Sequence, residues 1–341
     1  MKRARKGPAP GLARHSEPYI SRTAGPQMQT TDPQRGHPPR PIVETAPTGV
    51  EGPIRKRRER FLALASFLGD DSPVVREEIR RQYESAGRAG LPSLRRAARV
   101  DSPIVRSRAR TLLLEREKTL ALKRLLRHVS GGQIDLEKAL FLLACYAEPR
   151  LDPRPWQTRL DVLAREVVLR TQGIENRLDR AQAMVEYLSK KAGFGSAKGD
   201  FHHPDNVHIH RVIERKRGMP LTLCALYMFI GRRAGISTAC VPLPGLVMLR
   251  LHGDGESRIV DPYNRSQIRT DKDCREYLKQ NGLPVKGAWF RDADDLLLLK
   301  RQISNLVRSA ELRGIPREKR ELSLVGRALD LHLRTAAPRT V

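Results

Sequence analysis

Apolar residues recur at helical spacing through the middle of the chain. Leu136, Leu140 and Leu143, for example, follow one another at intervals of three or four residues. Residues at these intervals share one face of a helix, so the pattern predicts a layer of amphipathic helices. The segments that carry the pattern are 136–148, 156–171 and 177–193. A denser apolar run over 221–233 predicts a buried helix after this layer.

The pattern changes from helical to strand-like after that run. The sequence Gly-Asp-Gly-Glu-Ser follows His252 and is typical of a hairpin turn. We expect strands at about 237–251 and 256–262 on its two sides, with 286–290 as a candidate third strand. Helices that pack on a short antiparallel sheet make the predicted fold class α+β.

A short internal repeat lies nearer the N-terminus. The sequence Asp-Ser-Pro-Val-Val-Arg at 71–76 returns as Asp-Ser-Pro-Ile-Val-Arg at 101–106. In each copy Asp-Ser can cap a helix and Pro fits the first helical turn. We therefore expect a HEAT-like, all-helical region at 55–130. Its outer face would be either a polyanion-binding patch or a solvated surface, with six arginines: Arg95, Arg96, Arg99, Arg106, Arg108 and Arg110.

Residues 1–54 show almost no apolar periodicity. Ten of the 24 prolines of the chain lie there. A segment of this composition cannot bury enough apolar surface to offset the entropy lost on ordering, so we predict a disordered basic arm. This arm either contacts anions or is a solvated tail.

The charge of the chain indicates polyanions as one possible class of partner. Lys and Arg number 64 against 38 Asp and Glu, which gives a net charge of +26. Such an excess attracts polyanions, so weak, non-specific binding of nucleic acid is one hypothesis. Aromatic residues make up only 5% of the chain, which argues against a protein that stacks single-stranded bases.

The cysteines and apolar runs favour a reduced, cytoplasmic protein. Cys145, Cys224, Cys240 and Cys274 are widely spaced and include no Cys-x-x-Cys pair, so they predict neither a zinc site nor a disulfide framework. No apolar run reaches eighteen residues, and the basic N-terminus lacks the apolar core of a secretory signal. We expect no membrane insertion.

A series of short motifs carries a family resemblance. In order, these motifs are Gly193-Phe194, Pro204-Asp205-Asn206, Arg217-Gly218-Met219-Pro220, Gly235-Ile236, Pro244-Gly245 and Asp261-Pro262-Tyr263. Their order and spacing resemble those of bacterial transglutaminase-like proteins of the SirB-one type. A weaker likeness extends the resemblance to about 137–310. It implies a papain-type fold, in which a helical layer packs on a short sheet.

The resemblance also implies where a catalytic site would lie. A thiol enzyme needs a Cys at a helix start, a His on a neighbouring strand and an Asp that orients the His. The likeness places these positions at 220, 246 and 261. This chain has Pro220 and Leu246 at the first two, so the site is degenerate, and Asp261 remains as a catalytic remnant or as a turn-capping carboxylate.

Two alternatives use residues near these positions. Cys224 lies one helical turn beyond Pro220, so a displaced Cys224–His252–Asp261 triad would make the protein a cysteine-dependent hydrolase or acyl transferase. Burial of Cys224 as a small hydrophobe is the competing interpretation. Separately, metal binding would need His202, His203, His208 and His210 to converge.

The prediction is an α+β protein with an arm at 1–54, a HEAT-like region at 55–130, a transglutaminase-like domain at 131–310 and a C-terminal helical segment at 311–341. We expect a non-catalytic regulatory, binding or scaffolding module with a protein partner, no cofactor and no bound metal. Its cleft would be lined by Asn206, Tyr263 and Asn264, although Asn206 can instead fix a loop.

Overall fold

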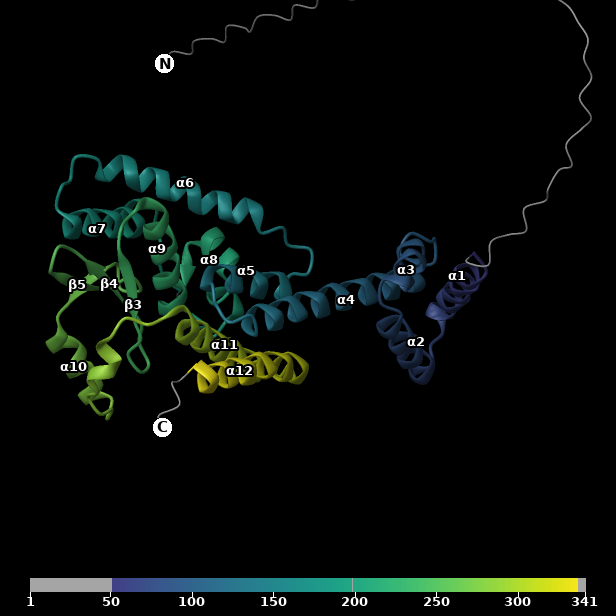
Figure 1. The fold of residues 1–341 in the computed structure, drawn as a ribbon. Coiled ribbons are helices and arrows are strands. Elements are labelled where there is room, and N and C mark those ends of the chain that lie inside the picture. Colours follow the sequence, from purple (N-terminus) through teal and green to yellow (C-terminus); the bar gives the residue numbers. More distant parts are fainter. Residues whose placement is uncertain (1–50, 198, 337–341) are drawn as a thin grey trace, which may run out of the picture. The chain divides into compact units, whose positions relative to one another are not determined.

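The computed structural model describes residues 51–197 and 199–336 (Figure 1). The predicted arm lies outside the described residues except for its last four, which belong to the first helix, Glu51–Ser66. That helix therefore begins earlier than the predicted boundary. None of the helices in the described ranges has the length and apolar composition of a membrane span.

A group of helices with its own apolar cluster precedes the transglutaminase-like part. They are α1 (Glu51–Ser66), α2 (Pro73–Ala86), α3 (Leu91–Ala97) and α4 (Pro103–Val129). The prolines of the two repeat copies, Pro73 and Pro103, each begin a helix, as predicted. The Ser102 side chain caps α4 by accepting a hydrogen bond from the Val105 N–H. The second copy, however, continues as the single long helix α4 rather than as a hairpin.

Helix α4 contributes to two apolar clusters. Ala109 packs with Phe61, Ile79 and Tyr83 in the cluster of the first helices. Leu125, sixteen residues further along, lies in the main core of the molecule. The change from one cluster to the other thus falls within α4, not at its end.

Among the described residues, the main core is built by the second half of α4 and by seven further helices. They are α5 (Leu136–Ala147), α6 (Arg154–Thr171), α7 (Arg177–Glu186), α8 (Ile209–Arg215), α9 (Pro220–Ala234), α11 (Asp295–Leu312) and α12 (Pro316–Ala336). Nearly every side chain of α9 is buried, which confirms the buried helix predicted from the apolar run. Its Arg233 donates hydrogen bonds to Glu137 of α5 and to Asp161 of α6, so the polar end of α9 is tied to two neighbours.

An antiparallel sheet lies against this core. Its order is β3 (Thr238–Val241), β4 (Met248–His252), β5 (Ser257–Asp261) and β6 (Gln267–Arg269). A second, two-stranded sheet pairs β1 (Gly195–Ser196) with β2 (Arg217–Gly218) in parallel. The hairpin between β4 and β5 is where the turn signal predicts it.

Alternate residues of the larger sheet enter two different cores. Leu249 and Val260 face the main core beside α9. Met248 and Ile259, one position away on the same strands, pack with α10 (Asp271–Gln280) in a smaller cluster on the opposite face. Side chains of a strand alternate between faces, so burial on both sides follows from this placement.

Two details of the predicted sheet are wrong. The segment 237–251 is not one strand, because β3 ends at Val241 and β4 begins at Met248. The segment 286–290 is not a strand but contains a 3₁₀ turn, Gly287–Phe290, whose Phe290 closes the cluster under α10.

Candidate functional site

Pro220 stands at the start of α9, where the family resemblance places a nucleophile. The backbone of Met219 caps the helix in an extended conformation, and its N–H donates to the Asn206 carbonyl over 2.8 Å. Pro fits the first helical position because it has no N–H that would need a partner there. The scaffold for a helix-terminal nucleophile is therefore present, and the residue there carries none.

Leu246 stands where the family resemblance places the general base. It lies in the turn that precedes β4, where its N–H donates to the Leu243 carbonyl over 3.1 Å. Its half-buried side chain packs on the cluster formed by the sheet and α10. The Leu246 side chain thus makes apolar contacts and cannot accept a proton.

Asp261 ends β5, and its side chain is only 1% exposed. Its carboxylate accepts hydrogen bonds from the Tyr263 N–H (3.1 Å), the Asn264 N–H (3.2 Å) and the Asn264 side-chain amide (2.6 Å). These bonds close the turn between β5 and β6. The turn-capping interpretation of Asp261 accounts for its contacts.

A cavity of about 330 Å³ opens beside Asp261, between the sheet and α10. We call it the Asp261 cavity. It is lined by Leu246, Met248, Asp261, Asn264, Arg269, Asp273, Cys274, Glu276, Tyr277 and Gln280. Leu246 forms part of its wall without filling it, so a mostly polar recess lies beside Leu246 and Asp261.

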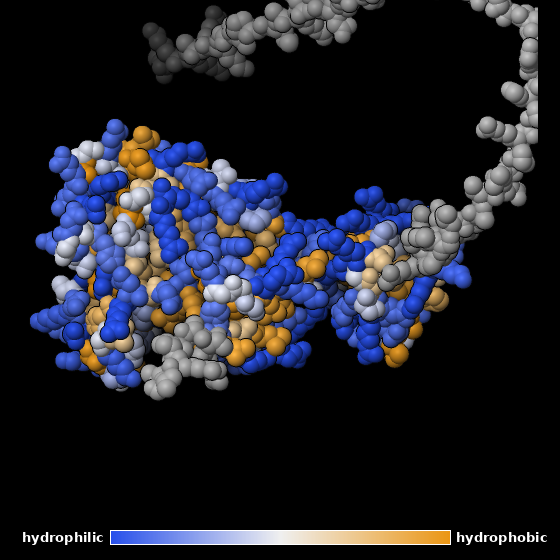
Figure 2. Space-filling view, viewed as in Figure 1, coloured by the Kyte–Doolittle hydropathy of each residue, from blue (hydrophilic) through white to orange (hydrophobic). Residues whose placement is uncertain are grey.

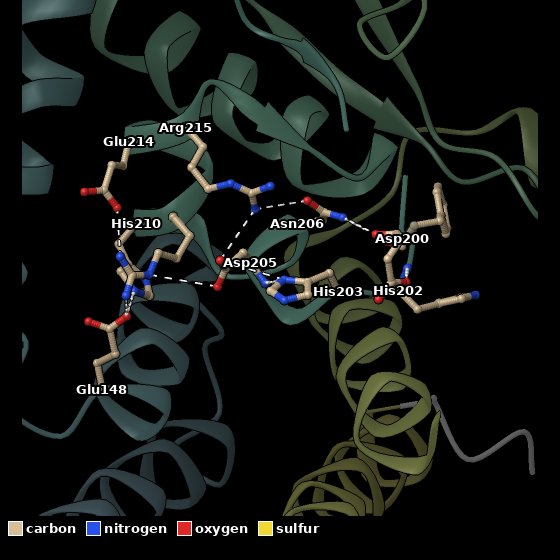
Figure 3. A network of polar contacts seen from close by, with 11 residues as sticks. Glu148, Asp200, His202, His203, Asp205, Asn206, His210, Glu214 and Arg215 are labelled. Atoms are coloured by element: carbon tan, nitrogen blue, oxygen red, sulfur yellow. Dashed lines mark hydrogen bonds and ion pairs between the residues drawn. The ribbon is translucent and has the colours of Figure 1, made fainter. Parts of the chain in front are cut away.

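Of the three residues predicted to line the cleft, only Asn264 lines this cavity. The Tyr263 hydroxyl instead donates to the Ala197 carbonyl over 3.2 Å. Asn206 is absent from the lining, and its buried amide donates to the carbonyls of Asp200 (2.7 Å) and Phe201 (3.3 Å) (Figure 3). Asn206 therefore fixes the loop that leads to α9, which is the structural alternative.

The displaced triad is not assembled. Cys224 is fully buried and its thiol donates to the Val247 carbonyl over 3.4 Å. Burial, followed by the nearby Cys240 thiol and Asp261 carboxylate, raises the pKa of Cys224 well above its ordinary value. Such a thiol stays protonated, whereas catalysis requires the thiolate.

His252 contacts an acid other than Asp261. Its Nε2 is 2.9 Å from an Asp292 carboxylate oxygen, and the residue pairs with Ser257 across the sheet. Asp261 is four residues from Ser257 along β5, which corresponds to about 13 Å of strand. The structure therefore does not bring His252 to Asp261.

The predicted histidine cluster divides into separate contacts. His210 is buried and its Nε2 lies 2.9 Å from Glu148, whereas His203 accepts a hydrogen bond from the Asp205 N–H (Figure 3). His208 is also buried, and burial, followed by the charges of His210 and nearby basic residues, lowers its pKa to about 3. Across 51–197 and 199–336, no group of three or more His, Cys, Asp or Glu residues is arranged to hold a metal ion.

Two residues of the helical layer, Gln302 and His210, make polar contacts that we did not predict from the sequence. Gln302 of α11 donates to the Val207 carbonyl (2.6 Å) and the Thr222 hydroxyl (3.0 Å). Its place on the apolar face of a helix, four residues after Leu298, is a signal that could have revealed it. The Glu148–His210 pair joins residues 62 positions apart, and no local pattern indicates it.

Comparison with known proteins agrees with this geometry. Residues 154–304 match the sequence model of the transglutaminase-like superfamily, which supports the predicted transglutaminase-like domain. The predicted resemblance to SirB-type proteins is confirmed, because similar bacterial proteins carry the names UPF0162 and SirB1.

Three relatives show the extent of the similarity. A UPF0162 protein of Xylella fastidiosa is 25% identical over 151 residues, which cover 44% of this chain and 54% of the relative. Protein SirB1 of Salmonella typhimurium is 24% identical over 145 residues, with 41% and 54% covered. Human F-box only protein 21 is 26% identical over 168 residues, with 47% and 26% covered.

The similarity thus concerns one domain. The chain spans about half the length of these bacterial relatives. No solved structure matches the chain significantly.

Proposed function

We propose that the transglutaminase-like domain is a regulatory or scaffolding module that binds a protein partner without thiol catalysis. The observation that carries the proposal is the pair Pro220 and Leu246, which stand where the family resemblance places the nucleophile and the base. Neither side chain can donate or accept a proton. The scaffold that would position a reacting thiol is retained, while the groups that would react are replaced.

The neighbouring polar groups support the same proposal. Asp261 uses its carboxylate to close a turn, and Cys224 is buried with a raised pKa. Neither group is free to take over the missing roles. The displaced-triad enzyme therefore has no support from the contacts around these residues.

The Asp261 cavity is the proposed binding site. Of the three carboxylates in its lining, Asp261 is engaged in its turn and lies 3.9 Å from the one arginine, Arg269. Asp273 and Glu276 therefore supply the negative charge that a ligand would meet. An acceptor-rich recess suits a ligand that donates hydrogen bonds and carries positive charge. We propose a segment of a partner protein that inserts a lysine or arginine side chain.

Thiol labelling tests the absence of thiol catalysis. The native full-length chain is treated with iodoacetamide near pH 7, and modified residues are located by mass spectrometry. Cys224 is expected to stay unmodified until denaturant is added. Fast modification of Cys224 alone in the native protein would support an enzyme instead.

A selection experiment tests the cavity. Displayed peptides are selected against the full-length protein and their dissociation constants are compared with those for Glu276→Lys. We expect basic peptides whose affinity falls at least tenfold with this variant. The matched control is Glu256→Lys, because Glu256 is exposed in the β4–β5 turn away from the cavity. Equal losses for both variants would contradict cavity binding.

A further inference from the structure

A second and larger cavity lies outside the degenerate site. Its volume is about 800 Å³, within the range typical of small-molecule sites. It lies where the end of α4, the following turn, α5 and the start of α11 meet. We call it the α4–α5 cavity, and its lining is Arg124, Arg127, His128, Gly131, Gln133, Ile134, Asp135, Lys138, Leu142 and Asp295.

Three cations of this lining have no anionic partner among the described residues. Arg124, Arg127 and Lys138 make no side-chain hydrogen bond or ion pair with any residue that the structure describes. Arg124 and Arg127 are three positions apart on α4, so they are neighbours on its surface. Lys138 faces the same cavity from α5.

The two carboxylates of the lining are already engaged. Asp135 caps α5 by accepting a hydrogen bond from the Lys138 N–H over 3.0 Å. Asp295 accepts one from the Leu136 N–H over 3.0 Å and pairs with Arg232 at 2.8 Å. The charge of Asp295 is balanced by Arg232, and Asp135 supplies one negative charge against three cations, so the cavity keeps a net positive charge.

The wall also has an apolar part and a fixed turn. Ile134 and Leu142 are half-buried, with one side packed on the main core. Their remaining surface lies in the cavity lining. His128 accepts a hydrogen bond from the Asp135 N–H over 3.2 Å, which holds the turn between α4 and α5 against the end of α4.

We infer that the α4–α5 cavity binds a nucleoside di- or triphosphate. Phosphate oxygens would pair with Arg124, Arg127 and Lys138, because guanidinium and ammonium groups are the usual hydrogen-bond donors to phosphate in proteins. The base would lie against Ile134 and Leu142. A ligand with one charged and one apolar end matches both parts of the wall, whereas nucleic-acid backbone would use only the cations.

The test is calorimetric titration of the full-length protein with ATP, inorganic tripolyphosphate and adenosine, each without added metal. ATP is expected to bind more tightly than either fragment. The double variant Arg124→Gln/Arg127→Gln should weaken ATP binding at least tenfold. Ile134→Ser should weaken ATP binding but leave tripolyphosphate binding unchanged.

The matched control is Arg95→Gln/Arg96→Gln, which removes the same charge from exposed arginines of α3 outside the cavity. This control should bind ATP as the wild type does. Equal weakening by the control, or tripolyphosphate binding as tight as that of ATP, would overturn the proposal. So would a lack of ATP binding alongside a DNA duplex that binds the wild type but not the cavity variant, since nucleic acid would then be the ligand.

Discussion

His208 shows at the residue scale how burial sets the charge of a side chain. The residue precedes α8 and is only 7% exposed. Its Nδ1 has no hydrogen-bond partner among the described residues. Burial without a partner for the added proton disfavours the imidazolium, so the pKa falls to about 3.

This shift predicts acid lability. The unfolded chain takes up a proton at His208 below about pH 6.5, whereas the folded chain does so only near pH 3. The contribution of neutral His208 to stability is therefore complete above about pH 6.5 and is lost as the pH falls toward 3. Urea unfolding should show a decrease of about 2 kcal/mol from this group between pH 7 and pH 5.

His208→Phe should reduce that decrease, because Phe takes up no proton in the unfolded state. His203→Asn is the control, since Asn can still accept the hydrogen bond from the Asp205 N–H. It should keep the wild-type pH dependence. An unchanged pH slope in His208→Phe would show that other groups set the acid lability.

Asp261 gives a second residue-scale prediction. Asp261→Ala removes the acceptor for three partly buried hydrogen bonds in the β5–β6 turn. The expected loss in free energy of unfolding is about 2–3 kcal/mol by chemical denaturation. Asp261→Asn retains one oxygen acceptor and should lose less. Wild-type stability of Asp261→Ala would contradict the turn-capping role.

At the scale of elements, the sequence predicted the buried helix and the hairpin better than the ends of the strands. The long apolar run of α9 and the turn after His252 are local signals. The break after β3 was present in the sequence as well, because Pro242 and Pro244 lack the N–H that a ladder needs. The three-residue strand β6 is too short for its own periodicity, and its pairing with β5 depends on the turn that Asp261 closes.

The motifs predicted the positions 220, 246 and 261, but they did not predict which residues line the Asp261 cavity. Pro220, Leu246 and Asp261 lie at the ends of elements whose order the motifs contain. Tyr277 and Glu276 come from α10, and nothing local to α10 indicates that it packs beside Leu246. That contact depends on how distant apolar faces pair, so the cavity could not be predicted from the sequence.

Helix α10 carries a prediction of its own, because it supplies one wall of the Asp261 cavity. Thr270 accepts from the Asp273 N–H over 3.1 Å, and the Asp273 carboxylate accepts from the Thr270 N–H over 2.8 Å. Thr270→Ala removes half of this capping box and should lower stability by about 1 kcal/mol. Hydrogen exchange should speed up mainly in the first turns of α10. Thr270→Ser preserves the hydroxyl and should exchange as the wild type does.

At the scale of the whole molecule, the main core includes residues of both the predicted domain at 131–310 and the predicted C-terminal segment at 311–341. We predicted a C-terminal segment from residue 311, but α11 continues through that position to Leu312. Leu322, Val325 and Leu329 of α12 are buried in the main core. The Tyr146 hydroxyl donates to Glu321 over 2.6 Å, which adds a polar tie between α5 and α12.

This shared core predicts that damage to α12 weakens the transglutaminase-like domain. Leu329→Ala leaves a cavity in the main core and should cost about 2–5 kcal/mol. The chain has two tryptophans, Trp156 beside the main core and Trp289 beside the cluster under α10. Variants that retain only one of them report on each cluster separately by fluorescence during urea unfolding.

Both tryptophans should report the same shift when Leu329→Ala is added, because the sheet contributes alternate side chains to both clusters and couples them. Leu324→Ala is the matched control, since Leu324 is 46% exposed on the same helix and should shift neither transition by more than about 0.5 kcal/mol. A shift at Trp156 with none at Trp289 would mean that the sheet does not couple the two clusters. A shift at neither would mean that α12 is an appendage, and the boundary at residue 311 would then be the correct one.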